Sequence, residues 1–199
     1  MSQAQDVVPR FDQKTSWKLA HKLGALAAGL LPFLVYVYYL CPTIAAGDTG
    51  ELITCAKILG IPHPPGYPLF TLIGRIFSYL PIHSVAWRVN LSSAVFCSLA
   101  CLFVYLSLFR LTANLWASLT GALGLALSRF FWHYAEVAEV FPLHLFLTAL
   151  LTYFLILMQT TAGENQQDRY PQTVKYFWAA SFFFGLALTN HHTIFLLAP

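Results

Sequence analysis

Long apolar stretches alternate with short polar segments along this chain. Five stretches approach or reach the roughly 20 residues that a helix needs to cross a bilayer. They are residues 23–41, 88–108, 114–130, 140–158 and 174–188. The pattern therefore predicts an all-α fold, a polytopic transmembrane helix bundle with about five spans.

Two shorter helices are expected between the first and second spans, at residues 49–59 and 69–80. Apolar residues recur at Leu52, Ala56 and Leu59, which is helical spacing. Each helix has only about a dozen residues, too few to cross a bilayer, so we expect both to lie in the membrane interface. The prolines between them favour a stiff, extended connection over residues 61–68.

Composition and charge place this bundle in a membrane and orient it. Hydrophobic residues make up 58% of the chain and charged residues 10%, too few to cover a soluble globule. Residues 1–22 carry four positive charges before the first span, which predicts a cytoplasmic amino-terminal segment followed by a membrane domain over 23–199. The loop at 42–87 then lies on the far, lumenal side. No basic stripe indicates nucleic-acid binding.

With this threading, three polar clusters that lie far apart in the sequence reach the same side of the membrane. Polar groups at a membrane boundary are typically functional. The clusters comprise Asp48, Glu51 and His63; His133, Glu136 and Glu139; and Asn190, His191 and His192. We expect them to surround one site, and we expect His144 to be no more than an interface or packing residue.

Each cluster also has a structural interpretation. Asp48 and Glu51 have the spacing of a capping box at the start of a helix. His63 can be a surface residue of a rigid turn, and the two glutamates can be solvated charges at a membrane exit. The histidines of the third cluster can be buried side chains whose hydrogen bonds are satisfied by their neighbours. The spacing of His133 and Glu136 allows a metal, but no second pair accompanies it, so we expect no metal site.

Carboxylates beside histidine and asparagine at a bilayer edge suit group transfer from a lipid-linked donor. The lipid tail lies in the membrane and its phosphate lies at the interface. A carboxylate can remove the proton of an acceptor hydroxyl, an effect worth about 10² to 10⁴ in rate. Histidine and asparagine can stabilise the charge of a leaving phosphate.

Four motifs resemble the transmembrane protein 260 family of endoplasmic-reticulum protein O-mannosyltransferases. They are Asp48-Thr-Gly-Glu51, Gly60-Ile-Pro-His63-Pro-Pro-Gly-Tyr67-Pro68, Ala135-Glu136-Val-Ala-Glu139-Val and Gly185-Leu-Ala-Leu-Thr-Asn190-His191-His192-Thr. The resemblance implies the GT-C membrane fold and inverting transfer of mannose from dolichyl phosphate mannose. It implies Ser or Thr acceptors in IPT domains of plexin-type receptors, with membrane lipid as surroundings and no cofactor.

The resemblance also implies roles for individual residues. Asp48 is expected to be the general base, with Glu51 helping to orient the acceptor. The donor and substrate are expected to contact His63, Tyr67, Glu136, Glu139, Asn190, His191 and His192. Five spans are fewer than GT-C enzymes have, so we expect this chain to be a truncated form.

Two other function classes fit the same pattern. A polytopic transporter also lines a cavity with intramembrane histidines and carboxylates, although it favours polar residues near mid-bilayer. A non-catalytic membrane scaffold or partner subunit fits a truncated chain. Transfer of mannose indicates the transferase, and uptake of solute indicates the transporter. An effect of deleting the protein, without an effect of point variants in the clusters, indicates the scaffold.

Overall fold

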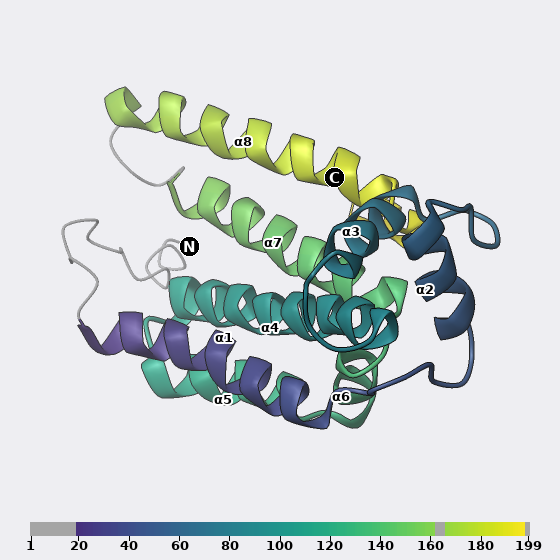
Figure 1. The fold of residues 1–199 in the computed structure, drawn as a ribbon. Coiled ribbons are helices and arrows are strands. Elements are labelled where there is room, and N and C mark those ends of the chain that lie inside the picture. Colours follow the sequence, from purple (N-terminus) through teal and green to yellow (C-terminus); the bar gives the residue numbers. More distant parts are fainter. Residues whose placement is uncertain (1–18, 162–165, 198–199) are drawn as a thin grey trace.

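The computed structural model describes residues 19–161 and 166–197, which are helical with no strand (Figure 1). The predicted cytoplasmic segment lies largely outside these residues. The helices are α1 (Leu19–Tyr39), α2 (Thr49–Ile58), α3 (Pro68–Ser78), α4 (Val85–Thr112), α5 (Leu115–Ala126), α6 (Arg129–Ala135), α7 (Val140–Thr161) and α8 (Gln166–Leu188), with a 3₁₀ helix, η1 (His192–Leu197). The all-α prediction is confirmed.

Helix α4 is the centre of the bundle. It packs against α1 and α5 on one side and α7 on the other, and α8 packs on the outer side of α7 (Figure 1). Its buried face consists largely of small residues, including Ser93, Ala94, Cys97 and Ala100. Small side chains let neighbouring helices approach closely, which is how helices associate where lipid replaces water.

Three described helices, α1, α4 and α7, are long and apolar enough to cross a membrane. They correspond to the first, second and fourth predicted spans, whereas the count of five stays a prediction. The third predicted span, 114–130, was wrong as one continuous helix, because the chain breaks between α5 and α6. Ser128 has an extended backbone and its hydroxyl donates to the Leu125 carbonyl, which competes with the helical hydrogen bonds.

The two short helices predicted after the first span are confirmed as α2 and α3, within two residues at each end. They cross closely at Gly74, where an added Cβ would lie 2.8 Å from the Cβ of Ala56. Leu52, Ala56 and Phe70 belong to the same buried cluster as Val89 of α4 and Leu143 of α7. The connection between α1 and α4 therefore packs onto the end of the bundle.

Asn90 joins three segments at this end of the bundle. Its amide nitrogen donates to the carbonyls of Cys41 and Thr43, at 2.8 and 3.0 Å, and its amide oxygen accepts from the Ala138 N–H at 2.8 Å. The side chain is fully buried. It thereby ties the exit of α1 and the α6–α7 turn to the first turns of α4.

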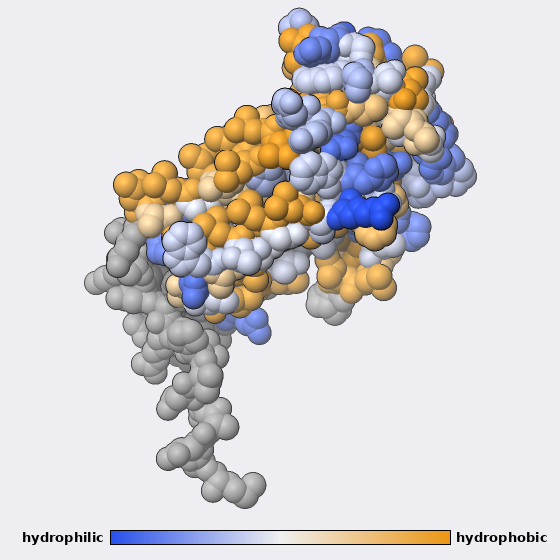
Figure 2. Space-filling model, turned by 90° about the horizontal axis from the view of Figure 1, so that it is seen from below, coloured by the Kyte–Doolittle hydropathy of each residue, from blue (hydrophilic) through white to orange (hydrophobic). Residues whose placement is uncertain are grey.

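The surface agrees with a membrane setting. Figure 2 shows apolar side chains over much of the flank of the bundle, with hydrophilic side chains gathered toward the end that carries α2 and α3. Helix α1, for example, exposes five leucine side chains: Leu23, Leu26, Leu30, Leu31 and Leu34. The candidate site lies at the hydrophilic end.

Candidate functional site

Segments distant in sequence meet at the hydrophilic end of the bundle. They are the start of α2, the loop 59–67, the α6–α7 turn and the turn after α8. The Leu69 N–H donates to the Thr189 carbonyl at 3.4 Å, which joins α3 to the end of α8. Glu139 interacts electrostatically with Asp48 and His63. The predicted convergence is thus present for Asp48 and His63 of the first cluster and Glu139 of the second.

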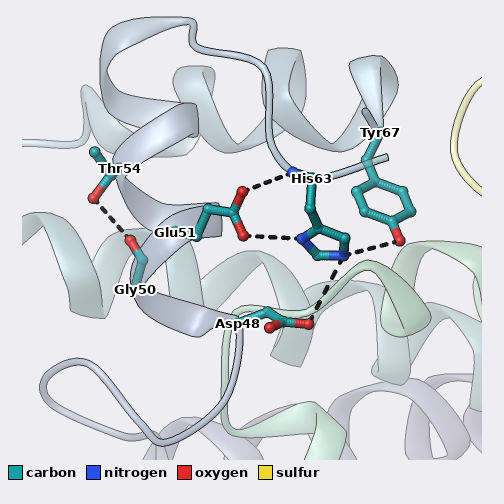
Figure 3. A network of polar contacts seen from close by, with 6 residues as sticks. All are labelled: Asp48, Gly50, Glu51, Thr54, His63 and Tyr67. Carbon is teal, nitrogen blue, oxygen red and sulfur yellow. Dashed lines mark hydrogen bonds and ion pairs between the residues drawn. The ribbon is translucent and has the colours of Figure 1, made fainter. Parts of the chain in front are cut away.

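Glu51 and His63 form the central contact of the site (Figure 3). The His63 backbone N–H donates to Glu51 Oε1 at 2.6 Å, and His63 Nδ1 lies 2.9 Å from Glu51 Oε2. The capping-box interpretation is wrong, because Asp48 precedes α2 without a side-chain cap and both Glu51 oxygens face His63. The loop 59–67 folds back along α2 and offers Glu51 two donors that a helix N-terminus alone does not.

The other ring nitrogen of His63 faces two further groups of the site (Figure 3). His63 Nε2 lies 3.3 Å from the Tyr67 hydroxyl and 3.9 Å from Asp48 Oδ2. Asp48 is the most exposed of the three charged side chains, at 61%, compared with 42% for Glu51 and 39% for His63. A substrate can therefore reach Asp48 from solvent.

Asp48, Glu51 and His63 together form what we call the acidic group. Tyr67 separates this acidic group from the histidines after α8. It precedes α3 with a left-handed backbone, φ 41° and ψ 54°, a conformation that costs a non-glycine residue about 1 to 3 kcal/mol. This backbone directs a largely buried ring between His63 and His191. The Tyr67 and His191 rings are nearly parallel, with centroids 6.2 Å apart.

The charges in the acidic group are coupled. The hydrogen bond with Glu51 raises the pKa of His63, and the nearby Asp48 and Glu139 carboxylates act in the same direction against desolvation. The hydrogen bonds from the His63 ring and backbone lower the pKa of Glu51. Burial raises the pKa of Glu139, and the negative charge of Asp48 adds to this effect. Solvent screens the exposed His63 and Glu51 pair, so its main effect is on protonation rather than on stability.

The structure separates the two glutamates that were predicted to act together. Glu139 is half-buried and faces the acidic group. The Glu136 carboxylate instead accepts a hydrogen bond from the Trp132 indole N–H, and the Glu136 carbonyl accepts one from the Cys41 N–H at 3.1 Å. Glu136 therefore holds the end of α6 against the exit of α1. His133 is exposed.

The histidines after α8 form a second polar group. His191 Nδ1 lies 2.8 Å from the Thr193 hydroxyl, which lies 3.0 Å from His144 Nε2. The His192 ring stacks on that of His191, with centroids 4.8 Å apart. His144, expected to be no more than an interface or packing residue, therefore belongs to this polar group through its contact with Thr193. Its position five residues after Glu139, near the start of a span, was the sequence signal that pointed here.

Asn190 is buried in a different way from its histidine neighbours. Its side chain is only 1% exposed, and its amide nitrogen donates to the Val140 carbonyl at 3.1 Å. Its amide oxygen has no partner among the described residues. Asn190 therefore ties the turn after α8 to the start of α7, beside Glu139.

Asp48, Glu51 and His63 each offer a ligand atom, and these atoms lie within 4.8 Å of one another, a spacing that a metal ion could bridge. Two of the side chains already bond to each other, and exposed acidic groups take this arrangement without metal. We assign no metal here on spacing alone. Independence from metal stays a prediction.

Residues 48–199 match a family model described as "Protein O-mannosyl-transferase TMEM260 N-terminal domain". The chain belongs to the TMEM260 family. This confirms the resemblance inferred from the four motifs. The matched region of the TMEM260 domain starts at Asp48, the residue before α2, and so contains every residue of the candidate site.

Two curated relatives of this TMEM260-family chain are named protein O-mannosyl-transferases. The chain is 34% identical to TMEM260 of Mus musculus over 181 residues, covering 90% of this chain and 25% of the relative. It is 34% identical to tmem260 of Dictyostelium discoideum over 174 residues, covering 82% of this chain and 21% of the relative. The chain thus spans about a quarter or less of each. No solved structure matches it.

Proposed function

We propose that this chain carries the catalytic end of a protein O-mannosyltransferase of GT-C type. The reaction is inverting transfer of mannose from dolichyl phosphate mannose to Ser or Thr of IPT domains in plexin-type receptors. The protein resides in the endoplasmic-reticulum membrane with its amino terminus in the cytoplasm. The observation that carries the proposal is that an exposed carboxylate, Asp48, lies 3.9 Å from His63 at one end of a membrane bundle, where the Tyr67 ring connects this group to His191. The names of the relatives support the same activity.

Asp48 acts as the general base in this proposal. The acceptor oxygen forms a bond to C1 of mannose while the bond from C1 to the phosphate oxygen breaks. The hydroxyl proton passes to the Asp48 carboxylate, and the electron pair of the broken bond leaves with dolichyl phosphate. A base placed in this way supplies about 10² to 10⁴ in rate. The high exposure of Asp48 leaves room for a polypeptide acceptor.

The leaving phosphate lies against the histidines after α8. His191 and His192 are stacked on each other, and His144 joins them through Thr193. Imidazole and hydroxyl groups donate hydrogen bonds to phosphate oxygens and stabilise the charge that develops there. Because Asn190 is buried against Val140, it positions this group rather than contacting the donor.

The sugar lies between the base and the phosphate site. Tyr67 separates the two groups and Glu139 interacts with Asp48 on the side of the base, so they border the mannose ring and limit its position. Glu136 contributes indirectly, because it holds the end of α6 through Trp132. His63 belongs with the acidic group rather than with the phosphate.

The decisive experiment is transfer by the chain reconstituted in lipid. The chain is incubated with dolichyl phosphate mannose and a purified IPT domain, and mass spectrometry reads hexose addition. A parallel preparation of a full-length TMEM260 relative serves as the positive control. Asp48→Asn removes the base and is expected to reduce transfer by at least about 10²-fold.

Thr54→Val is the matched control, because Thr54 lies on the same helix and, within the described part of the chain, its hydroxyl bonds only to the Gly50 carbonyl of that helix. Transfer by Asp48→Asn at the wild-type rate contradicts the assignment of the base. Solute uptake in liposomes without transfer favours a transporter. A cellular effect of deletion, with none from Asp48→Asn, favours a scaffold.

A further inference from the structure

We propose that Glu51 and His63 are a positioning pair for Asp48: Glu51 fixes the His63 ring, and protonated His63 holds the Asp48 carboxylate toward the acceptor. This inference rests on the proposed function, because it takes Asp48 as the base. It gives His63 and Glu51 different roles from those expected from the sequence. Neither residue needs to contact the substrate.

The first step is that Glu51 fixes His63 at two points. One carboxylate oxygen accepts the backbone N–H of His63, and the other faces ring Nδ1. Tyr67 packs against the same ring edge to face, with centroids 5.3 Å apart and planes at 76°. The imidazole therefore has one orientation, although the loop that carries it has no regular structure.

The second step concerns which ring nitrogen is free to change its proton. An ionised carboxylate only accepts hydrogen bonds, so His63 Nδ1 carries a hydrogen toward Glu51. Nε2 is then the nitrogen that gains or loses a proton. It lies between the Tyr67 hydroxyl at 3.3 Å and Asp48 Oδ2 at 3.9 Å. Neutral Nε2 accepts from Tyr67, whereas protonated Nε2 donates toward Asp48 after a small closure.

The third step is that Asp48 needs such a partner. Its carboxylate is 61% exposed and makes no hydrogen bond to its own helix, and among the described residues His63 is its one ion-pair partner. A base must be held within hydrogen-bond reach of its proton to be effective. Protonated His63 restricts the rotation of the Asp48 carboxylate, leaving the second oxygen for the acceptor.

The surrounding charges favour the protonated form. Glu51 faces His63 from α2, Asp48 from the residue before α2, and Glu139 from the α6–α7 turn, and all three carboxylates raise the pKa of His63. Tyr67 faces it from the start of α3. A phosphodiester donor is an anion and is repelled by carboxylates. The imidazolium offsets part of that repulsion.

The pH dependence of transfer tests this pair. Loss of the Glu51 charge lowers the pKa of His63, so less imidazolium remains at neutral pH. Glu51→Gln is expected to reduce transfer about tenfold at about pH 7.5 and to recover most of it at about pH 5.5, since each unit of pKa changes protonation tenfold. His63→Gln is expected to lower kcat at every pH with little change in acceptor KM. Equal loss by Glu51→Gln at every pH overturns the proposal.

A second readout does not depend on transfer. The His63 ring is titrated by NMR in detergent, with histidine carbons labelled and His63→Gln used to assign the signal. Glu51→Gln is expected to lower the titration midpoint of His63, because the hydrogen bond with the Glu51 carboxylate is the main cause that raises its pKa. Thr54→Val and His83→Gln are the controls; His83 packs on Trp87 and lies outside the site. An unchanged midpoint overturns the proposal.

The two proposals fail in different ways. If His63→Gln transfers mannose at the wild-type rate, the positioning pair is contradicted and Asp48 is still the proposed base. Absence of transfer by the wild-type chain, while the full-length relative is active, contradicts the proposed function of this chain and the role of the pair with it.

Discussion

The rings of Tyr67 and His191 lie nearly parallel, 10° apart in orientation and 6.2 Å between centroids, although 124 positions separate them in the chain. Tyr67 also places its hydroxyl 3.3 Å from His63. One side chain thus contacts both the acidic group and the histidine group. The distance between proposed base and phosphate site depends on this ring.

Replacing Tyr67 in two ways separates its two contacts. Tyr67→Phe keeps the stack on His191 and removes the hydroxyl, so we expect transfer to fall less than about tenfold, the loss of one hydrogen bond. Tyr67→Ala removes both contacts and the buried ring, and we expect at least about a further tenfold loss in kcat, because small misplacement of reacting groups is costly. Initial rates across donor concentrations measure both. Equal effects of the two variants would show that the stack is irrelevant.

His144 offers a test of the phosphate site. His144→Leu keeps the volume and removes the nitrogen that faces Thr193, so we expect the apparent affinity for dolichyl phosphate mannose to fall about five- to tenfold, equivalent to one hydrogen bond. Acceptor KM should stay unchanged. His21→Leu is the matched control, because His21 lies near the amino-terminal end of α1, the end away from the candidate site, and packs on Phe109. A change in acceptor KM alone would place His144 outside the phosphate site.

The sequence predicted elements and groups better than contacts. Apolar spacing was enough to find α2 and α3, because a short amphipathic helix shows its period locally. The pairing of Glu51 with His63 was not predictable, since a capping box and a distant donor compete for the same carboxylate. Only the return path of the loop 59–67 decides between them. For the same reason His144 looked like a packing residue until the turn after α8 was placed beside α7.

The break between α5 and α6 shows a different limit. Residues 114–130 have a continuous apolar pattern, and hydropathy does not register one serine that turns its hydroxyl onto a carbonyl. Asn90 is a similar case, because an asparagine near the start of a span does not reveal three partners in two other segments. Such contacts depend on tertiary structure.

Removal of metal tests the chemistry of the acidic group. Glu51 and His63 already bond to each other, and the proposed reaction uses Asp48 as base without a metal. We expect EDTA treatment followed by dialysis to leave the transfer rate within about twofold, far from the loss expected when a catalytic metal is removed. Added Mg²⁺, Mn²⁺ or Zn²⁺ should not raise it. Loss of activity restored by one of these ions would make Asp48, Glu51 and His63 metal ligands.

Asn90 is expected to matter for stability rather than for chemistry. Asn90→Ala leaves the Ala138 N–H and the carbonyls of Cys41 and Thr43 without their partner. The buried Ala138 N–H costs about 1 to 3 kcal/mol when unpaired, and each lost bond to the less buried Cys41 and Thr43 carbonyls costs about 0.5 to 1.5 kcal/mol, so we expect the variant to lose about 2 to 6 kcal/mol of stability. Cys97 and Cys101 are fully buried free thiols, whereas Cys41 is half-buried, so in a Cys41→Ser background the reaction with a fluorescent maleimide during heating reports unfolding.

The matched control for Asn90 is Asn114→Ala. Asn114 caps α5 through the Ala117 N–H at an exposed position, and loss of such a cap costs about 1 kcal/mol. Maleimide labelling of Asn90→Ala should therefore begin at a clearly lower temperature than labelling of Asn114→Ala. Because Asn90 links the exit of α1 to the α6–α7 turn, transfer by Asn90→Ala at low temperature should stay close to wild type as long as the thiols remain protected. Early loss of transfer with protected thiols would instead place Asn90 in the site.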